Sequence, residues 1–475
     1  MTATLSLALS SGEARVLHKT LITDGNPVYN TIRRITAPAM PVIDKTAEKP
    51  ANKSLQCFEN SENSRPSSLI DRIFRTHQGG KIRVAGKFLI DNPESLAMAY
   101  TPGVSRVCQA VAADPALAYR LTGKGNSVAV VTDGSAVLGL GNVGPQAALP
   151  VMEGKAMLFR QLAGIDAWPI CLDTQDPDEI VRIVTAVAPG FGGINLEDIG
   201  APRCFEVERR LQDTLDIPVM HDDQHGTAVV VLAALLNALR VTGRRLDQVT
   251  IVVNGLGAAG IACCQLLLAA GAVYLRGCDK QGLVLTGRPE VLHHSRHRLP
   301  HLIRYDHPVG TLRQALRGAH VFIGLSVGNV LTPDDLKLMG QDPIVFALAN
   351  PDPELPPELG YRHCRIYASG RSDDPNQINN LLAFPGMFRG ALDARATTFN
   401  EPMLLAVASA LAALVPVRSL SGHYIIPSVF DPHVVPSVAN AVSQAARDTG
   451  VARHAAQTGQ PQSPNRYLTV NITDN

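Results

Sequence analysis

A glycine-rich turn between an apolar strand and a helix constrains the fold of this chain most strongly. Residues 249–254 (VTIVVN) form a β-branched run, and the sequence NGLGAAG then places three glycines in GxGxxG spacing: Gly255, Gly257 and Gly260. A helical pattern over residues 258–271 and a second strand-like run over 272–279 follow. A strand, tight turn, helix and strand in this order predict a βαβ unit with parallel strands.

Each glycine of this turn has a separate physical task. Gly255 permits the tight turn, Gly257 lets backbone N–H groups approach a pyrophosphate, and Gly260 lets helix and strand pack closely. The helix N-terminus adds partial positive charge. The motif therefore predicts a dinucleotide site, and the alternative is a glycine turn in a fold of this kind that binds nothing.

The residues that end the second strand bear on the choice of dinucleotide. Asp279 stands 24 residues beyond Gly255, where a carboxylate accepts a hydrogen bond from a ribose hydroxyl and favours NAD. Lys280 beside it would attract a 2′-phosphate and favour NADP. The sequence leaves both cofactors open.

The rest of the chain alternates strands and helices. Before residue 225 we expect strands at 127–134 and 167–173 and helices at 176–189 and 207–215; after it, a helix at 227–243 ended by Gly243 and strands at 319–326 and 343–350. This pattern predicts an α/β protein, with an N-terminal α/β substrate and metal domain (69–224) followed by a Rossmann-like doubly wound parallel-sheet domain (225–447). Polar composition predicts a poorly ordered extension over 1–68, or a small structured cap, and a polar tail over 448–475.

Composition narrows the function. The 475 residues carry a formal net charge of +1, so we expect no nucleic-acid partner and no anionic membrane partner. Eight scattered cysteines without a CxxC pair are typical of reduced thiols and favour a cytoplasmic location. The N-terminus is a poor signal peptide, and the best apolar run, 226–238, is too short to span a membrane.

Two pairs of acidic residues lie at the ends of strand-like segments. Glu197 and Asp198 follow GFGGINL, and Asp222 and Asp223 follow LDIPVMH. Adjacent carboxylates at the ends of buried strands are costly unless a cation or proton neutralises them, and oxygen ligands suit Mg²⁺ or Mn²⁺. The alternatives are surface acids or helix caps; capping competes directly at Asp223, just ahead of the predicted helix.

Other polar residues gain meaning only from their surroundings. Tyr100 precedes a Pro-Gly turn, and Lys155 follows a glycine; a lysine beside a divalent cation has a lowered pKa and suits a general base. Asn350 follows a strand, at the edge where parallel sheets bind ligands. The paired Asn379 and Asn380 are typical of a turn. We interpret His221 and His225 as hydrogen-bonded structural residues and leave them out of the metal site.

Together these motifs resemble the short bacterial-type malic enzymes. The matching stretches cover roughly residues 80–445 and include AYTPGV, GNSVAVVTDGSAVLGLGNVGP, LPVMEGKAMLF, FGGINLEDI, PRCFEVE, IPVMHDDQHGTA, NGLGAAGIA, ALANPDP and NQINNLLAFPG. The resemblance implies oxidative decarboxylation of malate to pyruvate with NAD or NADP and with Mg²⁺ or Mn²⁺. It also implies a homo-oligomer, a dimer or a tetramer.

The resemblance also implies roles for individual residues. Lys155 would be the general base and Tyr100 the acid that protonates the enol. The metal ligands would be Glu197, Asp198 and Asp223, with Asp222 as an unassigned neighbour. The cofactor site would comprise Gly255, Gly257, Ala258, Ala259, Gly260, Asp279 and Asn350, while Asn350 and Asn380 would hold the substrate.

The chain departs from the family pattern at two places. Leu256 stands where alanine is more usual and would crowd a pyrophosphate. Ala136 replaces an arginine that grips a substrate carboxylate in larger members, so backbone N–H groups near residues 101–104 become candidates for that contact. The alternative function is a metal-dependent oxaloacetate decarboxylase with weak or lost nicotinamide chemistry, and the intact glycine motif argues against it.

Overall fold

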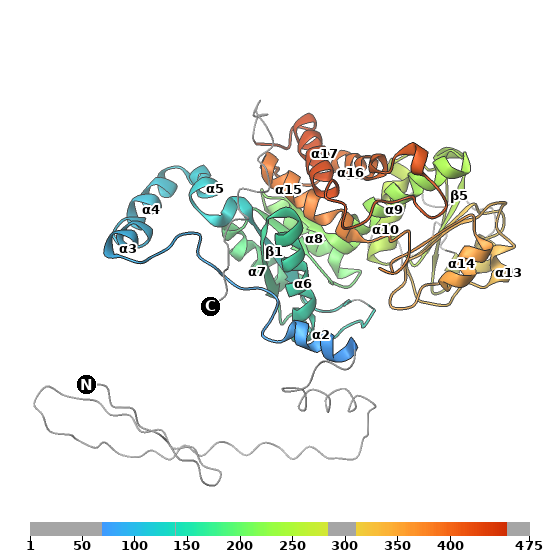
Figure 1. Ribbon diagram of the computed structural model, residues 1–475, viewed down its shortest axis with the longest axis horizontal. Helices are drawn as coiled ribbons and strands as arrows, with labels where there is room; N and C mark the ends of the chain where they lie inside the picture. Colours follow the sequence, from blue (N-terminus) through green and yellow to red (C-terminus); the bar gives the residue numbers. More distant parts are fainter. Residues whose placement is uncertain (1–68, 138, 284–309, 454–475) are drawn as a thin grey trace, which may run out of the picture. The chain divides into compact units, whose positions relative to one another are not determined.

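The computed structural model describes residues 69–137, 139–283 and 310–453 (Figure 1). The expected extension over 1–68 and most of the expected tail lie outside the described residues. Both sheets belong to one compact unit that begins at Ile73. Helix α2 is Leu69–His77.

The first sheet has four parallel strands in the order β2-β1-β3-β4. Its strands are β1 (Ser127–Thr132), β2 (Asp166–Cys171), β3 (Gly193–Leu196) and β4 (Val219–His221). The connecting helices are α6 (Pro145–Ala163), α7 (Pro177–Val187) and α8 (Arg203–Thr214). All six residues of β1 are buried, as the continuous apolar run predicted, and the strands and helices expected here are confirmed with small shifts at their ends.

The second sheet has six strands in the order β10-β9-β8-β5-β6-β7, parallel except for β7. Its strands are β5 (Thr250–Asn254), β6 (Tyr274–Asp279), β7 (Gly282–Leu283), β8 (Val321–Gly324), β9 (Ile344–Ala347) and β10 (Ile366–Ser369). The chain first runs outward from β5 to β6 and later returns to β8 on the other side of β5. The point between β5 and β8 is therefore a topological switch point, where ligands bind in folds of this kind. The α/β fold with a doubly wound parallel sheet is confirmed.

Helix α9 (Asp222–Thr242) joins the two sheets. It starts five residues earlier than the helix predicted from Thr227, so the expected domain boundary at residues 224 and 225 falls in its first turn. Acidic side chains suit that turn because of the helix dipole. Gly226 fits there because a Cβ at this position would lie 2.0 Å from Asp222 Oδ1. The C-cap of α9 is Gly243, as predicted, with φ 65°.

The body of α9 is a core helix. By length and composition it could cross a membrane, but it is mostly buried and packs against α10 and α16. The remaining long helices near it are α10 (Ala258–Ala269), α15 (Phe384–Ala394), α16 (Glu401–Leu414) and α17 (Val434–Asp448). Shorter elements are α12 (Leu312–Ala315), α13 (Pro333–Leu336), α14 (Pro357–His363), η1 (Pro115–Leu117), η2 (Gly123–Asn126), η3 (Ala188–Gly190), η4 (Leu246–Gln248), η5 (Asn380–Leu382) and η6 (Val417–Ser419).

Residues 82–121 form a segment with little core of its own, which we call the helical arm. It contains α3 (Pro93–Ala99), α4 (Val104–Ala113) and α5 (Ala118–Leu121), whose main packing partners are one another and the adjoining short turns. Figure 1 places α3 and α4 away from α6 and α9. No residue of α4 is buried. Large apolar side chains are exposed along the arm: Val84, Phe88, Leu89, Ile90, Leu96 and Met98.

Candidate active site

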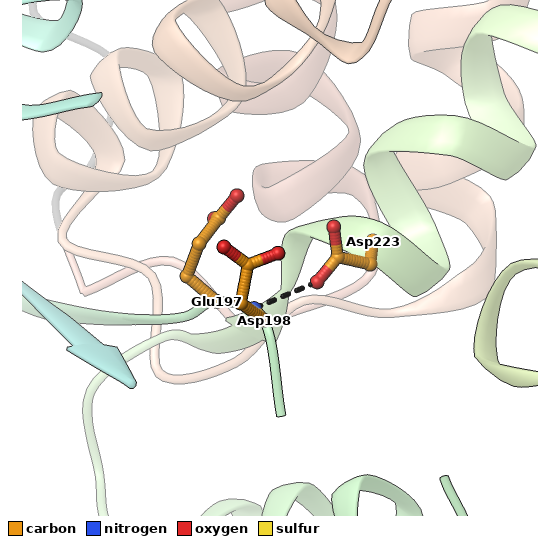
Figure 2. Close-up of side chains that lie close together, drawn as sticks. All are labelled: Glu197, Asp198 and Asp223. Carbon is orange, nitrogen blue, oxygen red and sulfur yellow. Dashed lines mark hydrogen bonds between the residues drawn. The ribbon is translucent and has the colours of Figure 1, made fainter. Parts of the chain in front are cut away.

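The carboxyl edge of the first sheet brings three acidic side chains together. Glu197 and Asp198 directly follow β3, and Asp223 lies in the first turn of α9, directly after β4. Their ligand oxygens all lie within 4.8 Å of one another, and Figure 2 shows the carboxylates facing a common space. Glu197 and Asp198 are buried, and Asp223 is partly exposed. The three residues predicted as metal ligands therefore form one cluster.

The backbone of Asp198 is held in an unusual conformation. Its φ of 53° lies in the left-handed region, which costs an aspartate roughly 1–2 kcal/mol. Two hydrogen bonds hold it: Asp198 N–H donates to Asp223 Oδ2 (2.9 Å; Figure 2), and Ala136 N–H donates to Asp198 O (2.9 Å). The capping alternative for Asp223 is wrong, because its side chain accepts from Asp198 and the N-cap of α9 is His221.

Lys155 reaches the same cluster from the middle of α6. Its Nζ lies 2.5 Å from Asp222 Oδ2 and 2.7 Å from Glu197 Oε1. The ammonium also lies 4.1 Å from the centroid of the Phe384 ring, within the range of a cation–π contact. The lysine is buried, which a charged side chain tolerates only with partners of this kind.

The electrostatics of the cluster are dominated by negative charge. Burial alone would lower the pKa of Lys155, but Asp222, Glu197 and Asp223 outweigh it and raise that pKa above its ordinary value. Burial raises the pKa of Asp222 to about 6 and also raises the pKa of Glu197, although Lys155 opposes both shifts. Four carboxylates, with Asp198 included, surround one ammonium. A divalent cation on these hard oxygen donors would offset the excess charge, so the residues present fit Mg²⁺ or Mn²⁺.

Asp222 connects the lysine to the second half of the chain, a role that the sequence did not reveal. Asn380 Nδ2 donates to Asp222 Oδ2 over 2.7 Å, so one carboxylate oxygen contacts both Lys155 and Asn380. Gly226, one helical turn later, leaves room for this side chain. The spacing of four residues between Asp222 and Gly226 could have indicated this role. It does so only if α9 is known to begin at Asp222, because only then do the two residues lie on the same face of a helix.

Two further buried residues also escaped the sequence analysis. Asn195 Nδ2 donates to Glu197 Oε2 (2.8 Å) from the same face of the β3 segment, because residues i and i+2 share a face. Phe384 supplies the ring beside Lys155 and belongs to the motif NQINNLLAFPG. Neither an asparagine within a strand nor an aromatic residue in an apolar run stands out from sequence alone.

The two histidines of this region take different roles. His225 Nε2 lies 3.0 Å from Glu208 Oε1, and this buried glutamate also accepts the backbone N–H of His221 and a bond from Gln224. The ring of His221 is buried, with Nδ1 3.8 Å from Asp223 Oδ2. Among the described residues, the cluster that could hold a metal ion, Glu197, Asp198 and Asp223, includes neither histidine.

The glycine turn lies at the switch point of the second sheet. Gly255 has φ 105°, and a Cβ there would lie 2.5 Å from Leu325 O. A Cβ at Gly260 would lie 1.9 Å from Gly255 O. Gly257 is the exposed N-cap of α10, and its first two residues, Ala258 and Ala259, are half-buried. Backbone N–H groups at this helix N-terminus are thus open to a pyrophosphate.

Leu256 fits the turn without the crowding expected from its size. A Cβ at Gly277 of β6 would lie 2.8 Å from Leu256 Cδ1, so the leucine packs into space that this glycine leaves. The larger side chain is accommodated against the sheet, beside the apolar core.

Asp279 and Asn350 end two strands of the same sheet. Asp279, half-buried at the end of β6, accepts the N–H of Gln281 (2.8 Å), and Lys280 beside it is exposed. Asn350 is exposed after β9, and a Cβ at Gly139 would lie 2.4 Å from its carbonyl oxygen. The turn that follows β1 therefore approaches the carboxyl edge of the second sheet closely.

Glu354, which the sequence analysis missed, fixes the loops after β8 and β9. Its carboxylate is fully buried and accepts N–H bonds from Ser326 (3.1 Å) and Ala349 (3.0 Å). Burial raises the pKa of Glu354 although these N–H groups oppose the shift. This carboxylate positions the loop that carries Asn350.

Tyr100 lies apart from the other predicted catalytic residue. It is the C-cap of α3, its side chain is 63% exposed, and the helical arm that carries it lies away from α6 in Figure 1. The structure therefore does not bring Tyr100 and Lys155 together within one chain. The backbone N–H groups of Gly103 and Val104 donate to Ala97 O and Tyr100 O, so these two are not open for a substrate carboxylate.

A parallel sheet with a lysine–carboxylate cluster, and a second, mostly parallel sheet with a glycine turn at its switch point, are typical of two-domain nicotinamide-dependent oxidoreductases. The sequence patterns of two protein domains match this chain: the malic enzyme N-terminal domain over residues 79–212, and the malic enzyme NAD-binding domain over 224–356 and 363–447.

Individual relatives agree. The chain is 52% identical to an NAD-dependent malic enzyme of Geobacillus stearothermophilus over 89% of this chain and 87% of the relative. It is 47% identical to an NADP-dependent malic enzyme of Halomonas elongata over 75% of this chain and 88% of the relative. The crystal structure of malic enzyme from Pyrococcus horikoshii superposes with a TM-score of 0.76 at 44% identity, covering 82% of this chain and 93% of that one. The chain belongs to the malic enzyme family and is an enzyme with an NAD(P)-binding domain.

Proposed function

We propose that this chain oxidises malate and decarboxylates it to pyruvate and CO₂ while NAD or NADP is reduced. The observation that carries the proposal is the position of Lys155 beside Glu197, which with Asp198 and Asp223 forms a group of carboxylates that could hold a cation. Membership of the malic enzyme family supports the choice of malate. No feature of the described residues favours a decarboxylase without nicotinamide chemistry.

Glu197, Asp198 and Asp223 are the proposed cation ligands. The cation, Mg²⁺ or Mn²⁺, would supply Lewis-acid chemistry, and the nicotinamide held by the Gly255–Gly260 turn would supply the hydride acceptor. We place Asp279 at the cofactor ribose, with Ala258 and Ala259 at the pyrophosphate. Asn350 and Asn380 are the proposed contacts of the substrate and nicotinamide region.

Lys155 is the proposed general base. It would take the proton from the C2 hydroxyl of malate, which requires the neutral amine. The surrounding carboxylates favour the ammonium form, and a cation shared with those carboxylates would oppose them and lower the pKa of Lys155. Asp222 and Asn380 keep the amine in place, because Asp222 Oδ2 contacts both the Lys155 amine and the Asn380 amide.

Tyr100 is the proposed acid that delivers a proton to C3 after CO₂ is lost. Its distance from Lys155 in one chain supports a homo-oligomer in which the helical arm of one copy reaches the site of the next. Exposed Phe88, Leu89 and Met98 on the same arm support this arrangement, because several large exposed apolar side chains on one segment are typical of a subunit interface.

Co-expression of two inactive variants tests the shared site. If the active sites combine residues of two copies, oligomers of Lys155→Ala with Tyr100→Phe chains contain some intact sites, and about a quarter of wild-type activity returns for random dimers. If each chain supplies its own tyrosine, every site carries a defect and activity stays absent. Each variant expressed alone is the control.

We further propose that residues 69–224 form the substrate and metal domain, residues 225–447 the cofactor domain, and that the enzyme works in the cytoplasm. The direct test of the function is the initial rate of absorbance change at 340 nm with malate, Mn²⁺ and either NAD or NADP. Reduction that needs malate and Mn²⁺ together, with pyruvate as product, supports the proposal and decides the cofactor. Metal-dependent consumption of oxaloacetate without any reduction would replace it with the decarboxylase.

A further inference from the structure

A cavity of about 520 Å³ lies at the opposite, amino-terminal edge of the second sheet. Arg365 directly precedes β10, and its backbone N–H donates to Pro343 O just before β9. The last turn of α9, with Arg240, and the segment Val417–His423 complete the walls. The volume falls within the roughly 300–1,000 Å³ typical of small-molecule sites.

The charge of the cavity is positive. Arg240, Arg365 and His423 line it, and none of its lining residues is acidic. Arg240 Nη1 donates to Asn237 Oδ1 (2.7 Å), and a basic residue in the last turn of a helix is common. The Arg365 side chain is exposed at the open mouth of the cavity, and within the part of the chain that the structure describes its guanidinium makes no hydrogen bond or ion pair. An arginine without a partner in a concave site attracts oxyanions, which its planar fork binds with paired hydrogen bonds.

The cavity wall is a fixed structure. Two fully buried asparagines hold the segment that carries His423. Asn376 donates to Gly422 O (2.8 Å) and accepts from Ile425 N–H (3.0 Å), and Asn237 donates to Ile425 O (2.8 Å). Because Asn237 also accepts from Arg240, the loop and one arginine share the same buried support. Such a wall binds a ligand without first being ordered.

We propose that this cavity is a second ligand site, which binds a small organic anion bearing a phosphate group or clustered carboxylates. The two arginines and His423 would hold the charged groups, and Val417 and Leu420 would contact the organic part. The site is separate from the malate and dinucleotide sites, which lie at the carboxyl edges of the sheets.

The site is positioned to act on catalysis. Helix α9 carries Arg240 at one end and Asp222 at the other, about 27 Å away at 1.5 Å per residue. A second connection is the segment 376–380, in which Asn376 contacts the cavity wall and Asn380 contacts Asp222. Through these two connections, occupation of the cavity would act on the position of the Lys155 partner, and we expect the anion to change the KM for malate.

Calorimetric titration tests the site without turnover. The full-length enzyme, saturated with NAD and free of malate and divalent cations, is titrated with inorganic phosphate and separately with citrate at constant ionic strength. We expect saturable binding of at least one anion, one per chain, and the tighter anion identifies the charged group. Arg365→Gln should weaken binding at least tenfold, the scale of a lost charge-assisted pair.

The matched control is Arg362→Gln, which removes the same charge from an exposed position on the neighbouring helix α14 and should bind like the wild type. Absence of saturable binding by both anions overturns the proposal, as does equal weakening in the two variants. Malate kinetics then test the coupling: the anion should shift the KM for malate in the wild type and in Arg362→Gln but not in Arg365→Gln. Binding without any such shift would refute the coupling.

Discussion

The carboxyl edges of the two sheets are built on opposite principles. At the edge of the first sheet, four carboxylates and Lys155 are packed together, with an aspartate backbone held in the left-handed region. At the edge of the second sheet, glycines, amide groups and N–H donors predominate, and a buried carboxylate, Glu354, is held by backbone N–H groups. The first edge gathers buried charge, whereas the second provides a shaped backbone.

This difference predicts how each edge fails. Removing Lys155 from the first edge would leave its carboxylates buried without compensation, and removing a carboxylate would take away a proposed cation ligand, so loss of atoms should be harmful there. At the second edge the absent atoms are the important feature, since a Cβ at Gly260 or Gly255 would collide with carbonyl oxygens. Substitutions that remove side-chain atoms should therefore impair the site at the first edge. Substitutions that add side-chain atoms should impair the site at the second edge.

The largest effect is expected from Lys155→Ala. Loss of the proposed general base should lower kcat at least about 100-fold in the 340 nm assay, with a smaller change in the KM for the dinucleotide. Lys337→Ala, which removes an exposed lysine at the C-cap of α13, is the matched control and should keep the wild-type rate. A near-normal rate in Lys155→Ala would refute the assignment of the base.

Asp223→Ala should lower kcat by a similar factor for a different reason. The variant removes one of three clustered oxygen donors and the acceptor that holds Asp198 N–H. A chelator should abolish wild-type activity, and added Mn²⁺ should restore it in the wild type but not in the variant. Full activity in the presence of the chelator would show that the carboxylates serve only a structural purpose.

Gly260→Ala should raise the KM for NAD(P) at least about tenfold, while the cluster at the edge of the first sheet stays intact. Its Cβ would lie 1.9 Å from Gly255 O and would force the turn open. Gly190→Ala adds the same methyl group where a Cβ meets nothing within 4 Å, and its kinetics should match the wild type. An unchanged KM in Gly260→Ala would mean that the dinucleotide does not use this turn.

The smallest effect concerns Glu208, which connects α8 to the start of α9. Burial alone would raise its pKa, but His225 and His221 outweigh burial and lower it below the ordinary value of 4.5. A lowered pKa means that the carboxylate stabilises the fold above pH 4.5 and that this contribution is lost as the pH falls through the folded-state value. Glu208→Gln should thus reduce the free energy of unfolding by roughly 1–3 kcal/mol at pH 7 and by less at pH 4.

Chemical denaturation at both pH values measures this difference. Glu206→Gln, an exposed substitution on the same helix, should lie within about 0.5 kcal/mol of the wild type at either pH. A loss in Glu208→Gln that is as large at pH 4 as at pH 7 would mean that the hydrogen bonds, and not the charge of the carboxylate, stabilise this region.

The sequence predicted most strands of the two sheets because buried parallel strands are continuous apolar runs, and β1 and β5 are nearly wholly buried. It did not predict the short strands β7 and β10 of the second sheet. It did not predict that α9 begins at Asp222, since DDQHG has the composition of a loop and only the cluster around it makes a helical turn favourable. The roles of Asp222 and Glu354 depend on partners more than 60 residues away or on loop geometry, which no local pattern contains. The separation of Tyr100 from Lys155 likewise depends on the path of the helical arm.

The position of α9 has a mechanical consequence. Its first turn contributes Asp223 to the cluster at the first sheet, while its body is part of the core beneath the second sheet. Because Asp223 directly follows β4, a rotation of α9 relative to the first sheet would move Asp223 relative to Glu197 and Asp198. A cation held by all three carboxylates would therefore fix the orientation of α9, and with it the core of the second sheet, relative to the first sheet whenever it is bound.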